Sequence, residues 1–331
     1  MEEEVFPEKS GENSLPWLAG ERPLMLAPMQ GLTNRALRAL FIELVRPDVV
    51  FTEFVRVRPG SKKSINEADR REVLARQGGV PLVVQLIGRS REALVAAAIT
   101  AGELGAEHIN INLGCPFGRM SVNAAGGALL LQPTELPDIL NGLRRVVPKS
   151  LSVKLRSGYD DPHQVFSLLP LLEDCGVDFL VLHPRTVRQR YDGSADHAVT
   201  AALVRESRLP VIANGDIFSV ADFERVNELT GAAGFMFGRG AIADPWLFER
   251  VRGRAPLQVA PTQRRQDLAA YLDALLPRYR QRFCGERQTL DKLKDVLNFI
   301  PDPDLQRELK QLKKTRCIDD FCRQLARLSA A

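Results

Sequence analysis

The chain has 331 residues, of which 45% are hydrophobic and 26% are charged, and this composition is typical of a soluble globular protein with a sizeable core. It contains no run of about 18 apolar residues, and its first twenty residues are acidic and polar, so the sequence predicts neither a membrane span nor a signal peptide. We therefore expect a cytoplasmic protein. The five cysteines are scattered and form no C-x-x-C pair, which argues against a disulfide framework or a thiolate zinc site.

The formal net charge of +4 is unevenly distributed along the chain. From Ala255 onward there are 15 Lys and Arg against 10 Asp and Glu, whereas the preceding part has 30 against 31. A basic C-terminal part on a neutral body favours a polyanionic partner such as nucleic acid, although an ordinary solvated helical surface has a similar composition.

Residues 1–20 are predicted to be a disordered N-terminal extension, and regular structure is expected from about Leu24. Eight short apolar runs rich in branched residues then follow and are predicted to be strands. They are Leu24–Ala27, Val49–Thr52, Leu82–Leu86, His108–Asn112, Leu151–Leu155, Phe179–Leu182, Val211–Ala213 and Gly234–Phe237.

Stretches with helical periodicity lie between these runs, for example Arg91–Leu104 and Val165–Cys175. Eight strands that each precede a helix within about 250 residues predict a (β/α)₈ TIM barrel. The alternative is a doubly wound open sheet, but the turn after the first run, Ala27–Gly31, lacks the G-x-G-x-x-G pattern that such a sheet favours. We expect the barrel to occupy residues 21–254.

Residues 255–331 are predicted to form a small helical domain. The expected helices are Gln263–Phe283, which contains Pro277, and Leu290–Phe299, Leu305–Leu312 and Ile318–Leu328, with Gly285, Pro301 and Pro303 between them.

Active sites of such barrels lie at the C-terminal ends of the strands, so polar residues that end an apolar run are the candidates. These residues are Met29, Gln30, Glu53, Gln85, Asn112, Cys115, Lys154, Arg156, His183, Arg185, Asn214, Asp216 and Gly238–Gly240. The set lacks the carboxylate pair of a glycosidase and the residue spacing of a metal site, so no metal is expected.

Two glycine-containing turns follow the seventh and eighth runs. Asn214–Asp216 and Gly238–Gly240 occupy the position where barrels commonly bind phosphate, and Arg239 would supply a countercharge. The simpler alternative is that these glycines only permit tight turns.

Lys154 and Cys115 are candidates for chemistry. A lysine between Val153 and Leu155 would be costly to bury unless an anion or an electron-rich ligand such as a flavin meets it, or unless a neighbouring carboxylate pairs with it. Cys115 follows the fourth run in a polar loop, where a thiol can deliver a proton, whereas the other cysteines lie in apolar helical contexts typical of packing residues.

Seven motifs, taken in order, resemble those of the tRNA-dihydrouridine synthases. They are Leu26-Ala27-Pro28-Met29, Thr52-Glu53, Asn112-Leu113-Gly114-Cys115-Pro116, Val153-Lys154-Leu155-Arg156, His183-Pro184-Arg185-Thr186, Ala213-Asn214-Gly215-Asp216 and Gly238-Arg239-Gly240-Ala241. The segment Thr52–Val57 resembles the C-type bacterial subgroup, which modifies a uridine in the D-loop. Arg56 would then be a tRNA contact, unless it is only a solvated loop arginine.

The resemblance implies an FMN enzyme that NADPH reduces and that converts uridine in tRNA to dihydrouridine. Cys115 would be the general acid, Asn112 and Arg185 would orient the uracil, Arg156 and Tyr191 would contact the substrate, and residues 255–331 would bind tRNA. The FMN would be held by Ala27, Pro28, Met29, Gln85, Lys154, His183, Asn214, Gly215, Asp216, Gly238 and Arg239.

The sequence departs from the family pattern at three places. Pro184 replaces a small residue, the segment from Cys115 to Gly126 is one residue longer than usual with Arg119 at the customary basic position, and residues 1–20 precede the usual start. Two alternatives remain open: a flavin barrel that reduces a free pyrimidine or a small enone, and a non-enzymatic RNA-binding scaffold.

Overall fold

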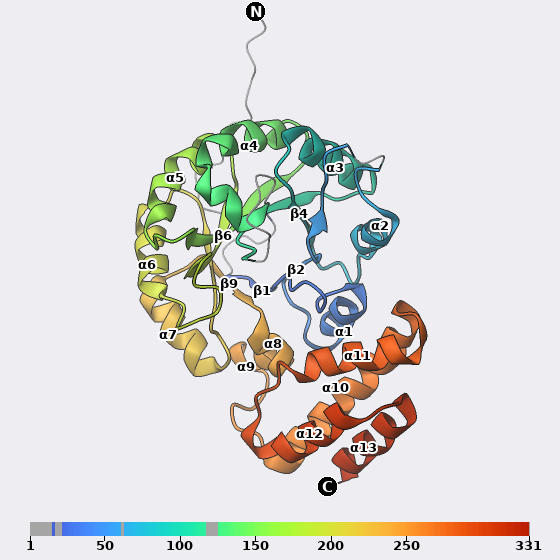
Figure 1. The fold of residues 1–331 in the computed structure, drawn as a ribbon. Helices are drawn as coiled ribbons and strands as arrows, with labels where there is room; N and C mark the ends of the chain where they lie inside the picture. The colour runs from blue at the N-terminus through green and yellow to red at the C-terminus, as the bar shows by residue number, and fades with distance from the viewer. Residues whose placement is uncertain (1–14, 17–21, 61–62, 117–124, 331) are drawn as a thin grey trace, which may run out of the picture.

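The computed structural model describes residues 15–16, 22–60, 63–116 and 125–330. Its centre is a closed barrel of parallel strands (Figure 1). The eight strands predicted from the sequence are all present, as β1 (Leu24–Leu26), β2 (Val49–Phe51), β4 (Leu82–Ile87), β5 (His108–Leu113), β6 (Ser150–Gly158), β7 (Phe179–Thr186), β8 (Val211–Asn214) and β9 (Gly234–Phe237).

Pairing between the first and last strands closes the barrel. Leu26 of β1 is in register with Phe237 of β9 on one side and with Val50 of β2 on the other. β2 then pairs with β4, so the ring is complete and a doubly wound open sheet is excluded. A two-residue strand, β3 (Val55–Arg56), extends the β2 edge along the end of β4 and was not predicted.

Helices surround the barrel as the alternating pattern predicts (Figure 1). Their bounds are α1 (Arg35–Val45), α2 (Glu67–Leu74), α3 (Arg91–Glu103), α4 (Leu136–Arg144), α5 (Gln164–Asp174), α6 (His197–Glu206), α7 (Val220–Thr230), α8 (Arg239–Ala243) and α9 (Leu247–Val251), with 3-10 turns at η1 (Gly126–Leu131) and η2 (Pro133–Glu135). Local chemistry sets several ends: Asn34 and Ser219 cap the first turns of α1 and α7, and Gly231 ends α7 with φ +57°.

The C-terminal part is helical, as predicted, with α10 (Pro261–Arg282), α11 (Gly285–Leu297), η3 (Pro303–Leu305), α12 (Gln306–Lys314) and α13 (Ile318–Ala330). The predicted stretch Gln263–Phe283 corresponds to α10, which continues through Pro277. A proline removes one helical hydrogen bond, but Leu275, Leu276 and Tyr279 around it are buried, and their packing holds the helix together.

The C-terminal helices share one apolar core with the outer helices of the barrel. The Phe41 ring of α1 meets the Tyr271 ring of α10 and the Phe248 ring of α9 edge to face, each at 6.3 Å between centroids. Leu272 and Leu293 belong to the same buried cluster. Figure 1 shows these helices gathered at one side of the barrel, next to α1 and α8.

A separate apolar cluster fills the barrel interior and includes Met25, Phe51, Val181 and Met236. Leu15 belongs to this cluster and is 7% exposed, so the chain is packed against the barrel at that residue. The rest of the predicted N-terminal extension, residues 1–14 and 17–20, lies outside the described residues. No helix in the described part of the chain combines the length and apolar character of a membrane span.

Candidate active site

The interior of the barrel changes from apolar to polar toward the C-terminal ends of its strands. Successive side chains of a strand face opposite sides, so residues two apart share the interior face. On β7 the order is Val181, His183 and Arg185, and on β6 Ser152 is followed by Lys154 and Arg156. The polar residues singled out in the sequence therefore meet at one end of the barrel.

A pocket at this end is lined by ten of the eleven residues predicted to hold FMN. Gln85 is the exception: it is fully buried and does not line the pocket. The pocket also contains Tyr191, which was predicted to contact the substrate, and Gly240 of the second glycine turn. Its further lining residues, which the sequence did not single out for the site, are Ile217, Phe218 and Met236.

Lys154 projects into the pocket. Its Nζ donates to Asn214 Oδ1 at 2.8 Å, and Asn214 in turn donates to the Met236 carbonyl. The carboxylate partner considered from the sequence is absent from the described part of the chain, since Lys154 forms no ion pair there. Burial, reinforced by nearby Arg156, lowers the pKa of Lys154 to about 7. Lys154 is thus a basic side chain of the pocket without an acidic partner among the described residues.

Replacing Lys154 by methionine should stabilise the ligand-free protein at low pH. The lysine pKa is lower in the folded protein than in the unfolded chain, so the cost of keeping it buried is complete below pH about 7 and disappears toward its ordinary pKa of about 10.4. We expect a gain of about 2 kcal/mol in the free energy of unfolding at pH 6, discounted because the pocket is open, and a smaller gain at pH 9. Urea unfolding at both pH values measures it, with Lys149→Met at the exposed opposite end of the barrel as the control. An equal change at both pH values would contradict this account of Lys154.

A partly buried ion cluster is centred on Asp216, in the glycine turn that follows β8. Asp216 accepts from Arg185 at 3.0 and 2.6 Å, from Arg239 at 2.8 Å and from the Ala195 N–H at 2.8 Å. Burial by itself would raise the pKa of Asp216, but the hydrogen bonds from Arg185 and Ala195 outweigh it and hold the pKa below its ordinary value. Asp216 is therefore an anion that fixes two guanidinium groups, one of which, Arg239, reaches the pocket.

Glycines are required at both turns of the pocket. Gly215 has φ +123°, and a Cβ there would lie 2.9 Å from the His183 ring. At Gly240 a Cβ would lie 2.1 Å from the Ile217 carbonyl oxygen, so α8 packs directly on the turn after β8. The alternative that these glycines only permit tight turns is therefore too narrow, since they also allow the two turns to approach each other.

His183 is neutral at physiological pH. Burial, then Lys154 and the surrounding arginines, lower its pKa well below the ordinary value. Its Nε2 lies 3.0 Å from Arg185 Nη1, and because arginine can only donate, Nε2 is the acceptor and the proton is on Nδ1. The Tyr191 ring lies next to both His183 and Arg239. Its centroid is 6.2 Å from the centroid of the His183 ring and 4.8 Å from the guanidinium carbon of Arg239.

A chain of amide hydrogen bonds leads from the barrel interior to Cys115. Gln85 donates to Asn110 Oδ1 and accepts from Asn112 Nδ2, both at 2.8 Å. Asn112 Oδ1 then accepts from the backbone N–H groups of Gly114 at 3.0 Å and Cys115 at 2.9 Å. The structure thus uses Asn112, predicted to orient uracil, to fix the backbone of Cys115, and it uses Gln85 to fix Asn112.

Two of the predicted substrate residues are held by backbone carbonyls. Arg156, 2% exposed, donates to the carbonyls of Gly114, Thr186 and Arg190. Arg185 donates to the Gly193 carbonyl in addition to Asp216. Both arginines therefore shape the loop after β7 that carries Tyr191. Arg56 lies apart from the pocket, exposed on β3, with its guanidinium 5.3 Å from the Phe54 ring centroid.

Cys115 is partly buried at the end of β5 and forms no disulfide. Its carbonyl accepts from the Gly127 N–H at 3.2 Å, which joins the residue after β5 to η1. The longer segment noted in the sequence, with Arg119, lies outside the described residues. Asn110 and Ser152 were missed as members of the network, although their positions two residues before Asn112 and Lys154 could have indicated them.

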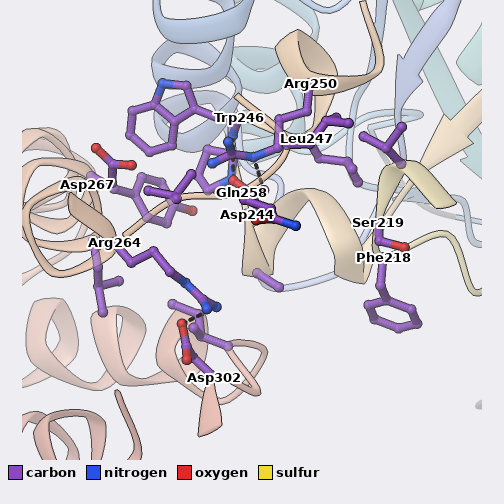
Figure 2. Close-up of a pocket in the computed structure, with 18 of the residues that line it drawn as sticks. Phe218, Ser219, Asp244, Trp246, Leu247, Arg250, Gln258, Arg264, Asp267 and Asp302 are labelled. Atoms are coloured by element: carbon purple, nitrogen blue, oxygen red, sulfur yellow. Dashed lines mark hydrogen bonds and ion pairs between the residues drawn. The ribbon is translucent and has the colours of Figure 1, made fainter. Parts of the chain in front are cut away.

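A second, larger cleft lies between the barrel and the C-terminal helices, and Figure 2 shows residues that line it. Its arginines are paired with acids, Arg250 with Asp244 at 2.8 Å and Arg264 with Asp302 at 2.5 Å. Phe218 is common to both cavities, but none of the residues predicted from the sequence to act at the site lines this cleft. Within the described residues, no group of three or more His, Cys, Asp or Glu is placed to hold a metal.

The fold and the pocket define a class of protein: a parallel (β/α)₈ barrel with a cationic pocket at the C-terminal ends of its strands. Comparison with solved structures agrees on the fold. A variant of NCR from Zymomonas mobilis aligns with a TM-score of 0.52 at 16% identity, covering 71% of this chain and 88% of that one. A morphinone reductase mutant in complex with tetrahydroNAD aligns with a TM-score of 0.51 at 14% identity, covering 72% and 89%.

Sequence comparison identifies the family. The model of the dihydrouridine synthase family matches residues 25–328. A tRNA-dihydrouridine(16) synthase of Cupriavidus necator is 36% identical over 70% of this chain and 73% of the relative. A tRNA-dihydrouridine synthase B of Vibrio cholerae is 35% identical over 69% and 70%. The chain belongs to the dihydrouridine synthase family.

Proposed function

We propose that this protein reduces uridine to 5,6-dihydrouridine in the D-loop of tRNA, with FMN as cofactor and NADPH as reductant. The observation that carries the proposal is the pocket at the barrel mouth, which is lined by Lys154, His183 and Arg239. Cys115 follows the C-terminal end of β5 and therefore lies at the same end of the barrel. In a member of this family, Lys154 would be the cation that faces the flavin, and Cys115 would be the acid that protonates the substrate.

The donor set of the pocket fits a flavin mononucleotide. The Asp216 backbone N–H donates to no acceptor among the described residues, and Arg239 reaches the same region, so the turn can receive a phosphate. At Gly238 a Cβ would be in ordinary van der Waals contact with the Met29 sulfur at 3.4 Å, so the backbone of this turn lies close to the first strand end. Lys154 would face the edge of the ring system that becomes negative on reduction.

When bound, FMN that NADPH has reduced would supply a hydride to C6 of the uracil. Cys115 would donate its thiol proton to C5, so that the carbon–carbon double bond gains one hydride and one proton. Asn112 would hold Cys115 in place through its backbone, and His183, being neutral, would accept or donate hydrogen bonds without adding charge. Tyr191, 48% exposed, would cover the inserted base.

A base in folded tRNA must leave its stack to reach the barrel mouth. The C-terminal helices are suited to grip the RNA backbone, because α12 buries Leu309 and Leu312 and exposes Lys310 and Lys314 on its other side. We assign tRNA binding to residues 255–331 on this charge and on the position of these helices at one side of the barrel, next to α1 and α8. Arg56, exposed at the end of β3, would add a contact from the barrel.

Neutralising the α12 lysines should weaken tRNA binding in a salt-dependent way. Removing one phosphate contact lowers the slope of log K against log salt by about 1, so Lys310→Gln with Lys314→Gln should lower it by about 1 to 2. Filter binding at several salt concentrations measures the slope. Lys149→Gln is the matched control, because Lys149 is an exposed lysine at the opposite end of the barrel. An unchanged slope in the double variant would mean that α12 does not meet the RNA.

The test of the proposed function is the absorbance spectrum of the purified protein under anaerobic NADPH, followed by addition of unmodified tRNA. We expect flavin bands that NADPH bleaches and that return with tRNA but not with free uridine. Return with a free pyrimidine would favour a small-molecule reductase, and a colourless protein that binds tRNA would favour a scaffold. Mapping of dihydrouridine in the treated tRNA tests the assignment to the D-loop.

A further inference from the structure

His197 contacts the glycine turn of the pocket from behind. It is the first residue of α6, it is 8% exposed, and it does not line the pocket. Its Nε2 lies 2.9 Å from the Gly215 carbonyl oxygen, and its Nδ1 lies 3.3 Å from the hydroxyl of Thr200, which is fully buried. Neither residue belongs to the set that the sequence motifs indicated.

These partners fix the protonation of the ring. A carbonyl oxygen can only accept, so Nε2 must carry the proton and donate it to Gly215. Burial lowers the pKa of His197, which keeps the ring neutral, and Nδ1 is then free to accept from the Thr200 hydroxyl. The side chain is therefore a donor of fixed direction toward a single peptide group.

That peptide group is the one between Gly215 and Asp216. A trans peptide is planar, and its carbonyl and the following N–H point to opposite edges. When His197 holds the Gly215 carbonyl on the outer side, the Asp216 N–H is turned away from His197, toward the side on which Gly215 and Asp216 line the pocket. This N–H has no protein acceptor within the described chain. Gly215 at φ +123° and Asp216 at φ +48° are both left-handed, a conformation that the Gly215 contact stabilises.

We propose that His197 is a positioning residue for phosphate binding: by holding the Gly215 carbonyl, it directs the Asp216 N–H at the phosphate of the flavin nucleotide. The inference rests on the proposed FMN site and assigns part of its affinity to a side chain that never touches the cofactor.

The experiment compares FMN with riboflavin, which has the same ring system and no phosphate. Dissociation constants are measured by quenching of flavin fluorescence on the full chain after removal of bound flavin, for the wild type, His197→Leu, His197→Gln and Thr200→Val. We expect His197→Leu to weaken FMN about tenfold, the effect of removing one hydrogen bond, and to change riboflavin affinity less than about twofold. His197→Gln, whose amide can donate to Gly215, should restore most of the FMN affinity. Thr200→Val should cause a smaller loss for FMN alone.

Each outcome has a distinct meaning. Equal losses of FMN and riboflavin affinity in His197→Leu, or no recovery in His197→Gln, would overturn the positioning role, because a general packing defect affects both ligands. Unchanged FMN affinity would overturn it as well. A wild-type protein that binds neither flavin would instead remove the proposed function. Should His197→Leu fail to fold, the FMN-to-riboflavin ratio of Thr200→Val decides, and an unchanged ratio refutes the proposal.

Discussion

Replacing Cys115 by alanine should leave FMN bound while it slows turnover on tRNA by about 10²- to 10⁴-fold, the usual contribution of a positioned general acid. The side chain is small and Asn112 holds the backbone rather than the thiol, so the pocket should keep its shape. NADPH should still bleach the flavin at the wild-type rate, because that half-reaction needs no proton from Cys115. Only the return of the flavin bands on addition of tRNA should be slow.

Stopped-flow absorbance separates the two half-reactions. Cys317→Ala, a change at an exposed cysteine of the C-terminal part, is the matched control and should retain both rates. Loss of flavin from Cys115→Ala would show that the thiol is structural, and unchanged reoxidation by tRNA would refute its role as the acid.

Replacing Asp216 by asparagine should lower the free energy of unfolding by about 3 kcal/mol, because it leaves the guanidinium of Arg185 buried without its anion. The Arg185 side chain is 2% exposed and has two of its hydrogen bonds to this carboxylate. Asparagine tolerates the left-handed conformation that Asp216 adopts at φ +48°, so the substitution changes charge with little change in backbone strain. Arg239 would lose its ion pair too, and FMN binding should weaken with it.

Urea unfolding of the ligand-free protein measures this loss. The pKa of Asp216 is lowered in the folded protein, so its contribution is present above the unfolded pKa of about 3.9 and is lost as pH falls through the folded pKa. The difference between variant and wild type should therefore be constant from pH 5 to 8 and should shrink below pH 4. Asp160→Asn, which breaks an exposed pair with Arg188, should change stability by less than about 0.5 kcal/mol. A similar small effect at Asp216 would mean that water already screens the cluster.

The barrel could be predicted because each of its eight main strands is a short branched apolar run that ends at a polar residue. The two-residue strand β3 carries no such signal and depends on pairing with the end of β4. Helix α10 continues through Pro277 for a related reason, since burial of the neighbouring leucines against other helices outweighs the low helical propensity of proline.

Which residues gather in the pocket followed from the same pattern, because strand ends meet at one rim. The hydrogen-bond partners of these residues could not be predicted from that pattern. Whether Arg156 faces a ligand or a carbonyl depends on how the loop around Arg190 folds back, and the sequence does not specify that path. The contact of His197 with Gly215 joins a helix start to a turn 18 residues away, and only tertiary structure reveals it.

The common core of α10 with α1 and α9 sets a limit on how this protein can choose its uridine. Packed interiors switch between discrete arrangements and do not stretch, so the span from the α12 lysines to the barrel mouth is a fixed length. Neighbouring nucleotides of a stacked strand are displaced by about 3.4 Å, which is enough to bring a different base to the opening when the RNA is gripped one step away. If the α12 lysines hold the RNA backbone as we propose, the protein selects its uridine by distance along the RNA and need not contact the bases around it. A change in which uridine is reduced would then arise from residues far from Cys115, on the helical surface that we propose binds the backbone.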